Sequence, residues 1–217
     1  MNGRFKQIVL DALYPNGCAC PLCMEEAVLG SDGLCDGCRA ALRCCPNPVC
    51  AEPLDGLTAA FLYTDPARSA VLRLKYGNAT YLADFFAAHI PIPERWTIDC
   101  MVPVPLHWLR ALRRGYNQSE MIAQALSERC AGLPVRTDLL RRIRSTPSQT
   151  NLDAAARKKN MRGAFAADPR VKGLSILLVD DVVTTHATLT ACAAQLKKAG
   201  AARVYAACAC AAGDTHV

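Results

Sequence analysis

The stretch that most constrains this chain is residues 174–200, LSILLVDDVVTTHATLTACAAQLKKAG. It opens with an apolar run of strand length, 174–179, which ends at Asp180 and Asp181. A short turn rich in hydroxyl groups follows, and an apolar-periodic segment then stops at Gly200 after two lysines, as a helix C-terminus does. We therefore expect a buried strand, a tight loop and a helix whose first N–H groups point into the loop. Such a helix N-terminus is a typical anion site.

The polar residues of this segment suit a ligand that carries both a phosphate and a ribose diol. Thr184, Thr185 and Thr188 can donate hydroxyl groups beside the helix N-terminus, and Asp180 and Asp181 can accept from sugar hydroxyls. A capped helix with a solvated acidic turn would use the same residue types. The spacing closely resembles the phosphoribosyl-pyrophosphate (PRPP) loop of type I phosphoribosyltransferases, and this resemblance favours the binding site.

One position departs from that pattern, because His186 stands where the resembling loops have glycine. Glycine lets the backbone approach the 5′-phosphate without a Cβ in the way. Three outcomes are open for the histidine. It could fit with ordinary dihedral angles, its protonated ring could face the phosphate, or the ring could block the pocket.

Length and composition indicate a globular protein with an ample core. A chain of 217 residues that is 52% hydrophobic can hold one α/β domain and a small module. No apolar run approaches the roughly 18 residues of a membrane helix, and Asp11 interrupts the short apolar N-terminus, so neither membrane insertion nor a signal peptide is predicted. We expect a cytoplasmic protein, in which the 13 cysteines act as metal ligands or buried thiols rather than disulfides.

The positive charge is concentrated in one region. The chain carries a formal charge of +6, but residues 108–162 hold twelve basic and four acidic residues, a net +8. The remainder is −2. A basic region of this kind indicates a polyanionic partner such as pyrophosphate or nucleic acid, although a solvated basic face would have the same composition.

Four cysteines near the N-terminus have the spacing of a metal site. Cys20 and Cys23 form one C-x-x-C pair, and Cys35 and Cys38 form another after eleven intervening residues. Two such pairs complete the tetrahedral shell of Zn²⁺, and because all four ligands come from the protein, the site is structural rather than catalytic. A dithiol redox site is the alternative, but no βαβ pattern surrounds the cysteines.

Four further cysteines nearby remain without a predicted role. Cys45 and Cys50 enclose the sequence PNPV and resemble half of a second finger. The other two are Cys18 and Cys44. A ligand exchange between Cys18 and Cys20, or simple degeneration of a second finger, would both explain the pattern.

The middle of the chain predicts strands at 57–63 and 99–105 and helices at 66–75, 81–89 and 119–129. Lys75 has a position typical of a helix C-terminal charge, and His89 is expected to be structural. The loop 107–118 is rich in arginine and leads into a helix, so it predicts a second anion site.

The segment 141–165 combines a polar part and a basic part. Its polar part, 145–151, predicts an exposed loop, and 152–161 predicts a basic helical stretch. A loop between two anion-binding elements commonly acts as a lid that excludes water. A plain surface connection would have a similar sequence.

Taken together, these motifs resemble the ComF family, of the ComFC/GntX kind. The sequences are PVPLH-x5-RRGYNQSE, the spaced residues Gln149, Leu152, Arg157 and Asn160, the VDDVVTT loop, the LKY element and the tandem C-x-x-C pairs. They occur in the family's order over nearly the whole chain. The resemblance implies a type I phosphoribosyltransferase-like α/β domain (57–217) behind a double-zinc-ribbon-like, Zn²⁺-binding module (1–56).

The resemblance also implies roles for particular residues. Asp180 and Asp181 would be catalytic. The remaining site residues fall into three groups: PRPP-binding Val182, Val183, Thr184, Thr185, His186, Ala187 and Thr188; pyrophosphate-loop Pro105, Arg113, Arg114, Gly115 and Asn117; and lid or nucleic-acid residues Arg141, Arg142, Arg144, Gln149, Arg157 and Asn160.

In function, the resemblance implies PRPP binding with Mg²⁺ and a place in natural competence, in the handling of imported single-stranded DNA with competence or recombination proteins as partners. A phosphoribosyltransferase reaction is compatible with these motifs, but no sequence element identifies an acceptor. The alternative is a catalytically inactive adaptor that binds nucleic acid, or a PRPP or nucleotide sensor. Within 108–162 only Trp108 and Tyr116 offer aromatic stacking surfaces for a single strand.

Overall fold

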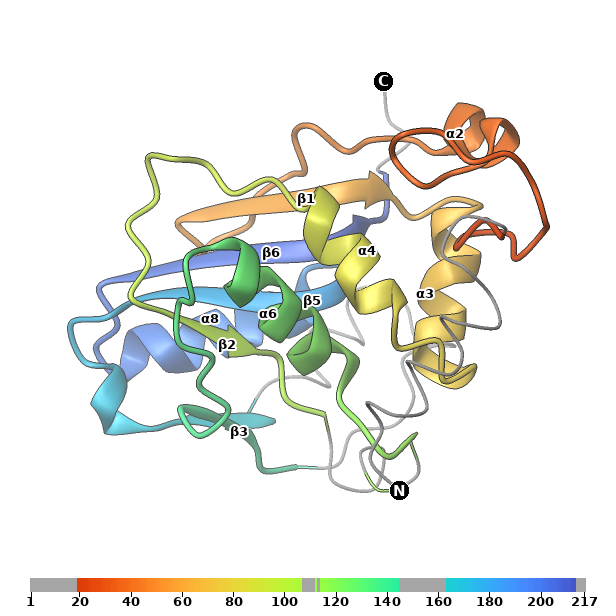
Figure 1. The fold of residues 1–217 in the computed structure, drawn as a ribbon. Coiled ribbons are helices and arrows are strands. Elements are labelled where there is room, and N and C mark those ends of the chain that lie inside the picture. Colours follow the sequence, from red (N-terminus) through yellow and green to blue (C-terminus); the bar gives the residue numbers. More distant parts are fainter. Residues whose placement is uncertain (1–18, 107–111, 113, 145–162, 214–217) are drawn as a thin grey trace.

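The computed structural model describes residues 19–106, 112, 114–144 and 163–213 (Figure 1). Its centre is a four-stranded parallel sheet. The strands, in spatial order, are β1 (Gly56–Leu62), β6 (Arg203–Ala211), β5 (Ser175–Val183) and β2 (Cys100–Pro103). The two central strands are buried along most of their length, which matches their near-continuous apolar sequences. The predicted α/β class with a parallel sheet is confirmed.

Helices cover both faces of this sheet (Figure 1). One face packs against α3 (Ala67–Tyr76), α4 (Leu82–His89) and α6 (Gln118–Arg129). The other packs against α8 (Ala187–Lys198). Alternate residues of β5 point to opposite faces of the sheet. Leu177 packs with α3, α4 and α6, and Leu178 packs with α8.

Local signals account for most of these elements. The strand predicted at 57–63 and the helices predicted at 66–75, 81–89 and 119–129 all appear within a residue or two of their expected bounds. Pro103 closes β2, an edge strand of the sheet, where a missing N–H interrupts no central ladder. β5 is longer than predicted, because it continues to Val183 and therefore contains both acids.

A second, smaller sheet leads into β5. Strand β3 (Leu140–Arg142) pairs antiparallel with β4 (Phe165–Ala167), and a short 3-10 turn, η2 (Pro169–Val171), follows. Between these two strands lies 145–162, so most of the expected lid falls outside the described residues.

The cysteine module lies beside α3 and the carboxyl end of β1 (Figure 1). It contains α2 (Asp36–Ala41), and its buried Cys20 and Leu34 share a core with α3 residues. After α2, the chain pairs with β1, where the Cys45 N–H donates to the Ala60 carbonyl oxygen at 3.0 Å. The division between 56 and 57 stays a prediction.

Four cysteines of the larger domain lie in its core. The cysteines Cys100, Cys192, Cys208 and Cys210 are buried free thiols, as expected for cysteines outside a metal site. No helix in the described ranges is long and apolar enough to cross a membrane.

Candidate functional site

A small hollow opens at the carboxyl end of β5, where the chain turns into α8. Its volume is about 280 Å³, including space open to solvent. It is lined by Asp180, Val182, Val183, Thr184, Thr185, His186, Ala187, Thr188 and Leu189. Ligands of open α/β sheets commonly bind outside the carboxyl ends of the strands. All seven residues predicted for the PRPP loop line this hollow, together with one of the two acids.

The first turn of α8 gives the hollow its anion-binding character. The helix begins at Ala187, and the first N–H that closes a turn within it is that of Thr190, which donates to His186 O at 2.8 Å. The N–H groups of Ala187, Thr188 and Leu189 precede that turn and have no partner inside the helix. Because these residues line the hollow, their N–H groups and the threonine hydroxyls can serve one anion.

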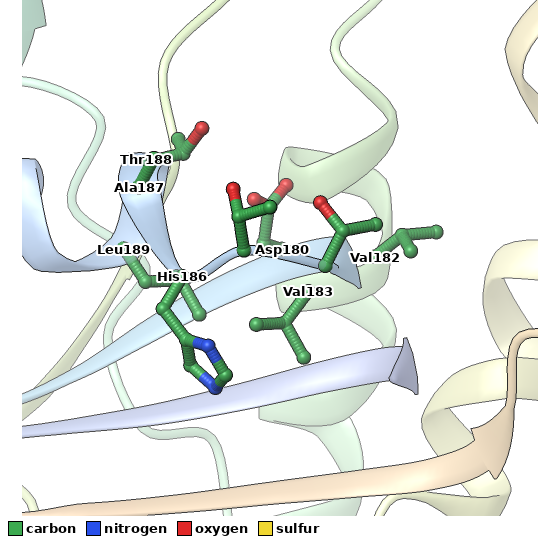
Figure 2. Close-up of a pocket in the computed structure, with 9 residues that line it drawn as sticks. Asp180, Val182, Val183, His186, Ala187, Thr188 and Leu189 are labelled. Carbon is green, nitrogen blue, oxygen red and sulfur yellow. The ribbon is translucent and has the colours of Figure 1, made fainter. Parts of the chain in front are cut away.

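His186 adopts the backbone conformation that glycine favours. Its φ is 61° and its ψ is −6°, which is the left-handed region. Its ring is bound elsewhere, since Nε2 lies 2.6 Å from the carbonyl oxygen of Val49. In Figure 2 the ring points to the opposite side of the loop from the Asp180 carboxylate and the Thr188 hydroxyl. The dihedral angles are therefore not ordinary, and the ring neither faces the loop hydroxyls nor covers them.

Asp180 is the acid that faces the hollow. Only 8% of its surface is exposed, and its Oδ1 accepts from the Ser119 hydroxyl at 2.9 Å and from the Asp181 N–H at 2.9 Å. Burial and, to a smaller extent, the neighbouring Asp181 carboxylate raise the pKa of Asp180 to about 7, against the opposing effects of the Lys75 ammonium and of the hydrogen bonds that Asp180 accepts. Near neutral pH this carboxyl therefore exchanges between its acid and its anion.

Asp181 is engaged on both of its oxygens. The Lys75 ammonium lies 2.7 Å from Oδ1, and the Gln118 side-chain amide donates to Oδ2. Burial alone would lower the pKa of Lys75, but the Asp181 carboxylate, with a smaller effect from Asp180, raises it above its ordinary value. Lys75 and Asp181 therefore form an ion pair inside the protein. The two consecutive acids differ in their surroundings, since Asp181 binds Lys75 and Asp180 lines the hollow.

Lys75 was missed as a site residue. Its place at the end of α3 suggested a solvated helix-terminal charge, whereas its side chain is only 20% exposed and meets Asp181. The LKY element was visible in the sequence, but nothing local identified its partner. Gln118 was expected in the arginine-rich loop and Ser119 at the start of a helix, and they prove to be donors to the two acids.

The described part of the arginine-rich loop reaches the same acids. Asn117 caps α6, since its Oδ1 accepts from the Ser119 N–H at 3.1 Å, and its amide donates to Val104 O at 3.1 Å. Arg114 donates to the Gln118 side-chain oxygen. Through Gln118, Arg114 is thus one side chain away from Asp181.

The other members of the predicted pyrophosphate loop take the following places. Pro105 is half-buried just after β2, and Gly115 has a φ of 82°, a conformation that glycine adopts without strain. Arg113 lies outside the described residues.

The basic residues predicted for a lid or a nucleic-acid surface are only partly described. Arg141 and Arg144 are exposed on and after β3, and the Arg142 guanidinium lies 5.5 Å from the Phe165 ring centroid. Gln149, Arg157 and Asn160 fall outside the described residues.

The four cysteines of the two C-x-x-C pairs converge. The sulfur atoms of Cys20, Cys23, Cys35 and Cys38 all lie within 4.8 Å of one another, and the distance from Cys23 Sγ to Cys35 Sγ is 3.8 Å. Tetrahedral zinc with bonds of about 2.3 Å would set its sulfurs about 3.8 Å apart. The Cys38 N–H also donates to Cys35 Sγ at 3.4 Å. This group could hold a zinc ion.

The remaining cysteines near the module do not join it. Cys44 and Cys50 are exposed, Cys45 is buried in the core beside α8, and Cys18 lies outside the described residues. Among the residues that the structure describes, the four-cysteine group is the only cluster of three or more possible metal ligands. The first C-x-x-C turn is fixed to α3, because Arg73 Nη2 donates to the carbonyl oxygens of Pro21 and Leu22 at 2.6 and 2.7 Å.

Comparisons with known proteins agree with this architecture. The family model for the phosphoribosyl transferase domain matches residues 112–217. The DNA utilization protein YhgH of Salmonella typhimurium is 33% identical over 88% of this chain and 96% of the relative. Competence protein F of Haemophilus influenzae is 28% identical over 83% of this chain and 91% of the relative. The chain belongs to the ComF family.

A solved structure shows a weaker likeness. The glutamine PRPP amidotransferase from B. subtilis, in complex with ADP and GMP, has a TM-score of 0.38 and 21% identity. The superposition covers 58% of this chain and 25% of that one. For this ComF-family protein, the fold assignment comes from its own parallel sheet and from the family match.

Proposed function

We propose that this ComF-family protein binds PRPP, with Mg²⁺, in the hollow between β5 and α8, and that it serves in the handling of imported single-stranded DNA in the cytoplasm. The observation that carries the proposal is the convergence of the first N–H groups of α8, threonine hydroxyls and the Asp180 carboxylate at one strand end. Relatives named for competence and for DNA utilization support the proposed role in DNA handling. Competence and recombination proteins would be its partners.

The geometry divides a PRPP molecule among three sets of groups. The 5′-phosphate would lie at the N-terminus of α8, beside Thr185 and Thr188. A ribose hydroxyl would donate to Asp180. The pyrophosphate would face the loop that carries Arg114, whose planar guanidinium suits phosphate oxygens. Mg²⁺ would be held mainly by the phosphates of PRPP, as is common for this ion in phosphate-transfer sites, and would neutralise part of their charge.

If a transfer reaction takes place, the residues favour loss of pyrophosphate. Breaking the bond between the ribose ring carbon and the pyrophosphate oxygen leaves the electron pair on pyrophosphate and positive charge on the ribose. An ionised Asp180 would stabilise that positive charge, and Arg114 would stabilise the leaving group. Lys75 would hold the Asp181 side chain in place without touching the ligand.

Calorimetric titration of Mg²⁺-PRPP tests the pocket. We expect wild-type protein to bind, and the Thr185→Ala/Thr188→Ala and Asp180→Asn variants to bind at least about tenfold more weakly, since hydrogen bonds to charged groups contribute roughly 1.5–3 kcal/mol. Thr190→Ala is the matched control, because its hydroxyl donates back to His186 O at 3.0 Å rather than into the hollow. Equal affinity in all four proteins, or no binding to any, would reject the PRPP site.

A nucleic-acid adaptor without catalysis is the second candidate, and the exposed Arg141 and Arg144 within the net +8 segment favour it. Binding through backbone phosphates weakens steeply as salt rises. We expect Arg141→Ala/Arg144→Ala to reduce the slope of log affinity against log salt concentration by about two, roughly one for each phosphate contact that is lost. A slope that these changes leave untouched would exclude this surface as the DNA-binding face.

We also propose that the four-cysteine group holds Zn²⁺ in a structural role. All four ligands are cysteine side chains, so no coordination position is left open for a substrate. The module would then order the turn that Arg73 binds.

A further inference from the structure

A tyrosine at the end of α3 exposes most of its surface beside the acid pair. Tyr76 is 77% exposed. The preceding residue, Lys75, turns inward and meets Asp181 at 2.7 Å. The backbone therefore carries this exposed ring to the edge of the site, one residue from the ion pair.

Other aromatic residues around the sheet are held by specific contacts. The Tyr116 hydroxyl donates to Leu74 O, and the ring of Tyr205 stacks on Trp96 with 4.4 Å between centroids. Within the described part of the chain, no group hydrogen-bonds the hydroxyl of Tyr76. Tyr116, which the sequence offered as a stacking surface, is thus anchored by its hydroxyl and only half-exposed, whereas Tyr76 is exposed.

One face of the Tyr76 ring is backed by a cation. The Arg114 guanidinium lies 5.0 Å from its centroid, within the range of a cation–π contact. Arg114 donates in turn to Gln118, and Gln118 donates to Asp181, which Lys75 also binds. The contacts form a closed ring from Tyr76 through the acid and back to α3. The aromatic surface is therefore fixed in position relative to the acid pair, although its outer face is open to solvent.

We propose that Tyr76, backed by Arg114, is the platform on which a nucleobase stacks next to the acid pair. The inference rests on the proposed PRPP site, because it extends that site by the class of acceptor or nucleic-acid ligand that it takes. A nucleotide joins a planar ring, a sugar and a phosphate within one short unit. The protein offers an aromatic face that Arg114 and Gln118 connect to the acid pair, and a carboxylate and a helix N-terminus that line the hollow beside it.

A base can come from two sources, a free base or nucleoside and a base within a single strand. Both would stack on the same ring, because stacking uses the π-face that every base has. A tryptophan at this position reports the contact directly, since a stacked base quenches indole fluorescence. The Tyr76→Trp variant is therefore titrated with adenosine, with a short oligodeoxynucleotide and with an abasic oligomer of equal length and charge. The matched control is Tyr81→Trp, at a tyrosine that is 41% exposed and whose hydroxyl contacts Pro21 O and Met24 Sδ in the cysteine module.

We expect the oligodeoxynucleotide to quench Tyr76→Trp more than the abasic oligomer does, with little effect on Tyr81→Trp. Quenching by adenosine as well would assign the platform to free bases. In wild-type background, Tyr76→Ala should weaken binding of the quenching ligand by about five- to a hundredfold, and Tyr76→Phe should restore it. Equal quenching by the abasic oligomer, equal quenching of both variants, or no quenching would overturn the proposal.

Titration of Mg²⁺-PRPP into Tyr76→Ala separates this proposal from the previous one. We expect Tyr76→Ala to change PRPP affinity by less than about threefold, because Tyr76 contributes neither to the lining of the hollow nor to the bonds of either acid, and Arg114 keeps its bond to Gln118. If the wild-type protein does not bind PRPP, only the PRPP site is rejected. The fluorescence titration would still show whether a base stacks on Tyr76.

Discussion

Arg73 and Lys75 lie two residues apart on α3 and bind to different parts of the protein. The Arg73 guanidinium donates to Pro21 O and Leu22 O in the first cysteine turn, at 2.6 and 2.7 Å. The Lys75 ammonium binds Asp181 Oδ1 at 2.7 Å. A single helical turn therefore connects the four-cysteine module to the acid pair.

This connection predicts that metal removal reaches the PRPP site. Stripping the metal with a chelator should loosen the turn that Arg73 binds, shift the end of α3 and lower the affinity for Mg²⁺-PRPP by about fivefold or more, the range of a modest coupling free energy. Calorimetry with and without metal measures it. In Arg73→Leu, which lacks both bonds to the turn, the metal should no longer matter. An equal response to chelation in both proteins would show that the coupling does not run through Arg73.

The Lys75–Asp181 pair predicts a large stability loss when only one partner is removed. Lys75→Met leaves the Asp181 carboxylate buried without its cation and should lower the free energy of unfolding by about 3–5 kcal/mol. Lys75→Met/Asp181→Asn removes both charges and should recover most of that loss. Denaturant unfolding measures both. The control is Arg170→Ala, which breaks exposed pairs with Asp138 and Asp168 and should lower the free energy of unfolding far less than Lys75→Met does. Additive effects in the double variant would contradict the pairing.

The sequence contained enough to predict the elements that local signals define. The apolar run of β5 and the lysines and glycine after α8 set the strand, the loop and the helix within a few residues. The two C-x-x-C pairs predicted a cluster that the structure assembles, because each pair needs only one turn to bring its sulfurs together.

The sequence did not contain the pairings between distant elements. Lys75 and Asp181 meet only because α3 and β5 lie in adjacent layers, so no local pattern around Lys75 could identify its partner. The different orientations of Asp180 and Asp181 follow from the extension of β5 past the apolar run, since consecutive strand residues point to opposite faces. The direction of the His186 ring depends on Val49, which lies between α2 and β1, far from His186 in the sequence.

The backbone of His186 predicts different outcomes for glycine and alanine. His186→Ala loses the bond to Val49 O and keeps a φ of 61°, whereas His186→Gly loses the bond but adopts this conformation without strain. The glycine variant should therefore be about 1 kcal/mol more stable than the alanine variant in denaturant unfolding. Because the ring points away from the loop hydroxyls, His186→Gly should change Mg²⁺-PRPP affinity by less than about threefold. A large gain in affinity would show that the ring obstructs the site.

The raised pKa of Asp180 predicts a particular pH dependence of stability. A carboxyl with a pKa of about 7 in the folded protein and an ordinary value when unfolded holds its proton more tightly when folded. Between about pH 4 and 7 the folded state binds more protons, so this group's contribution to stability falls as pH rises and is constant above 7, by up to about 4 kcal/mol in total. The difference in unfolding free energy between wild type and Asp180→Asn at pH 5 and pH 8 measures it. A difference that does not change with pH would show that Asp180 is ionised throughout.

The arrangement of the cysteines predicts which of them hold metal. Cys35 accepts from the Cys38 N–H and lies 3.8 Å from Cys23 Sγ, so Cys35→Ser should remove one of four ligands and release most of the zinc. Cys44 is exposed and lies outside the cluster, so Cys44→Ser should retain it. Metal content per chain, measured by elemental analysis after dialysis, checks both. Retention of a full equivalent in Cys35→Ser would mean that a cysteine outside the two pairs replaces it, and loss in Cys44→Ser would place the metal elsewhere.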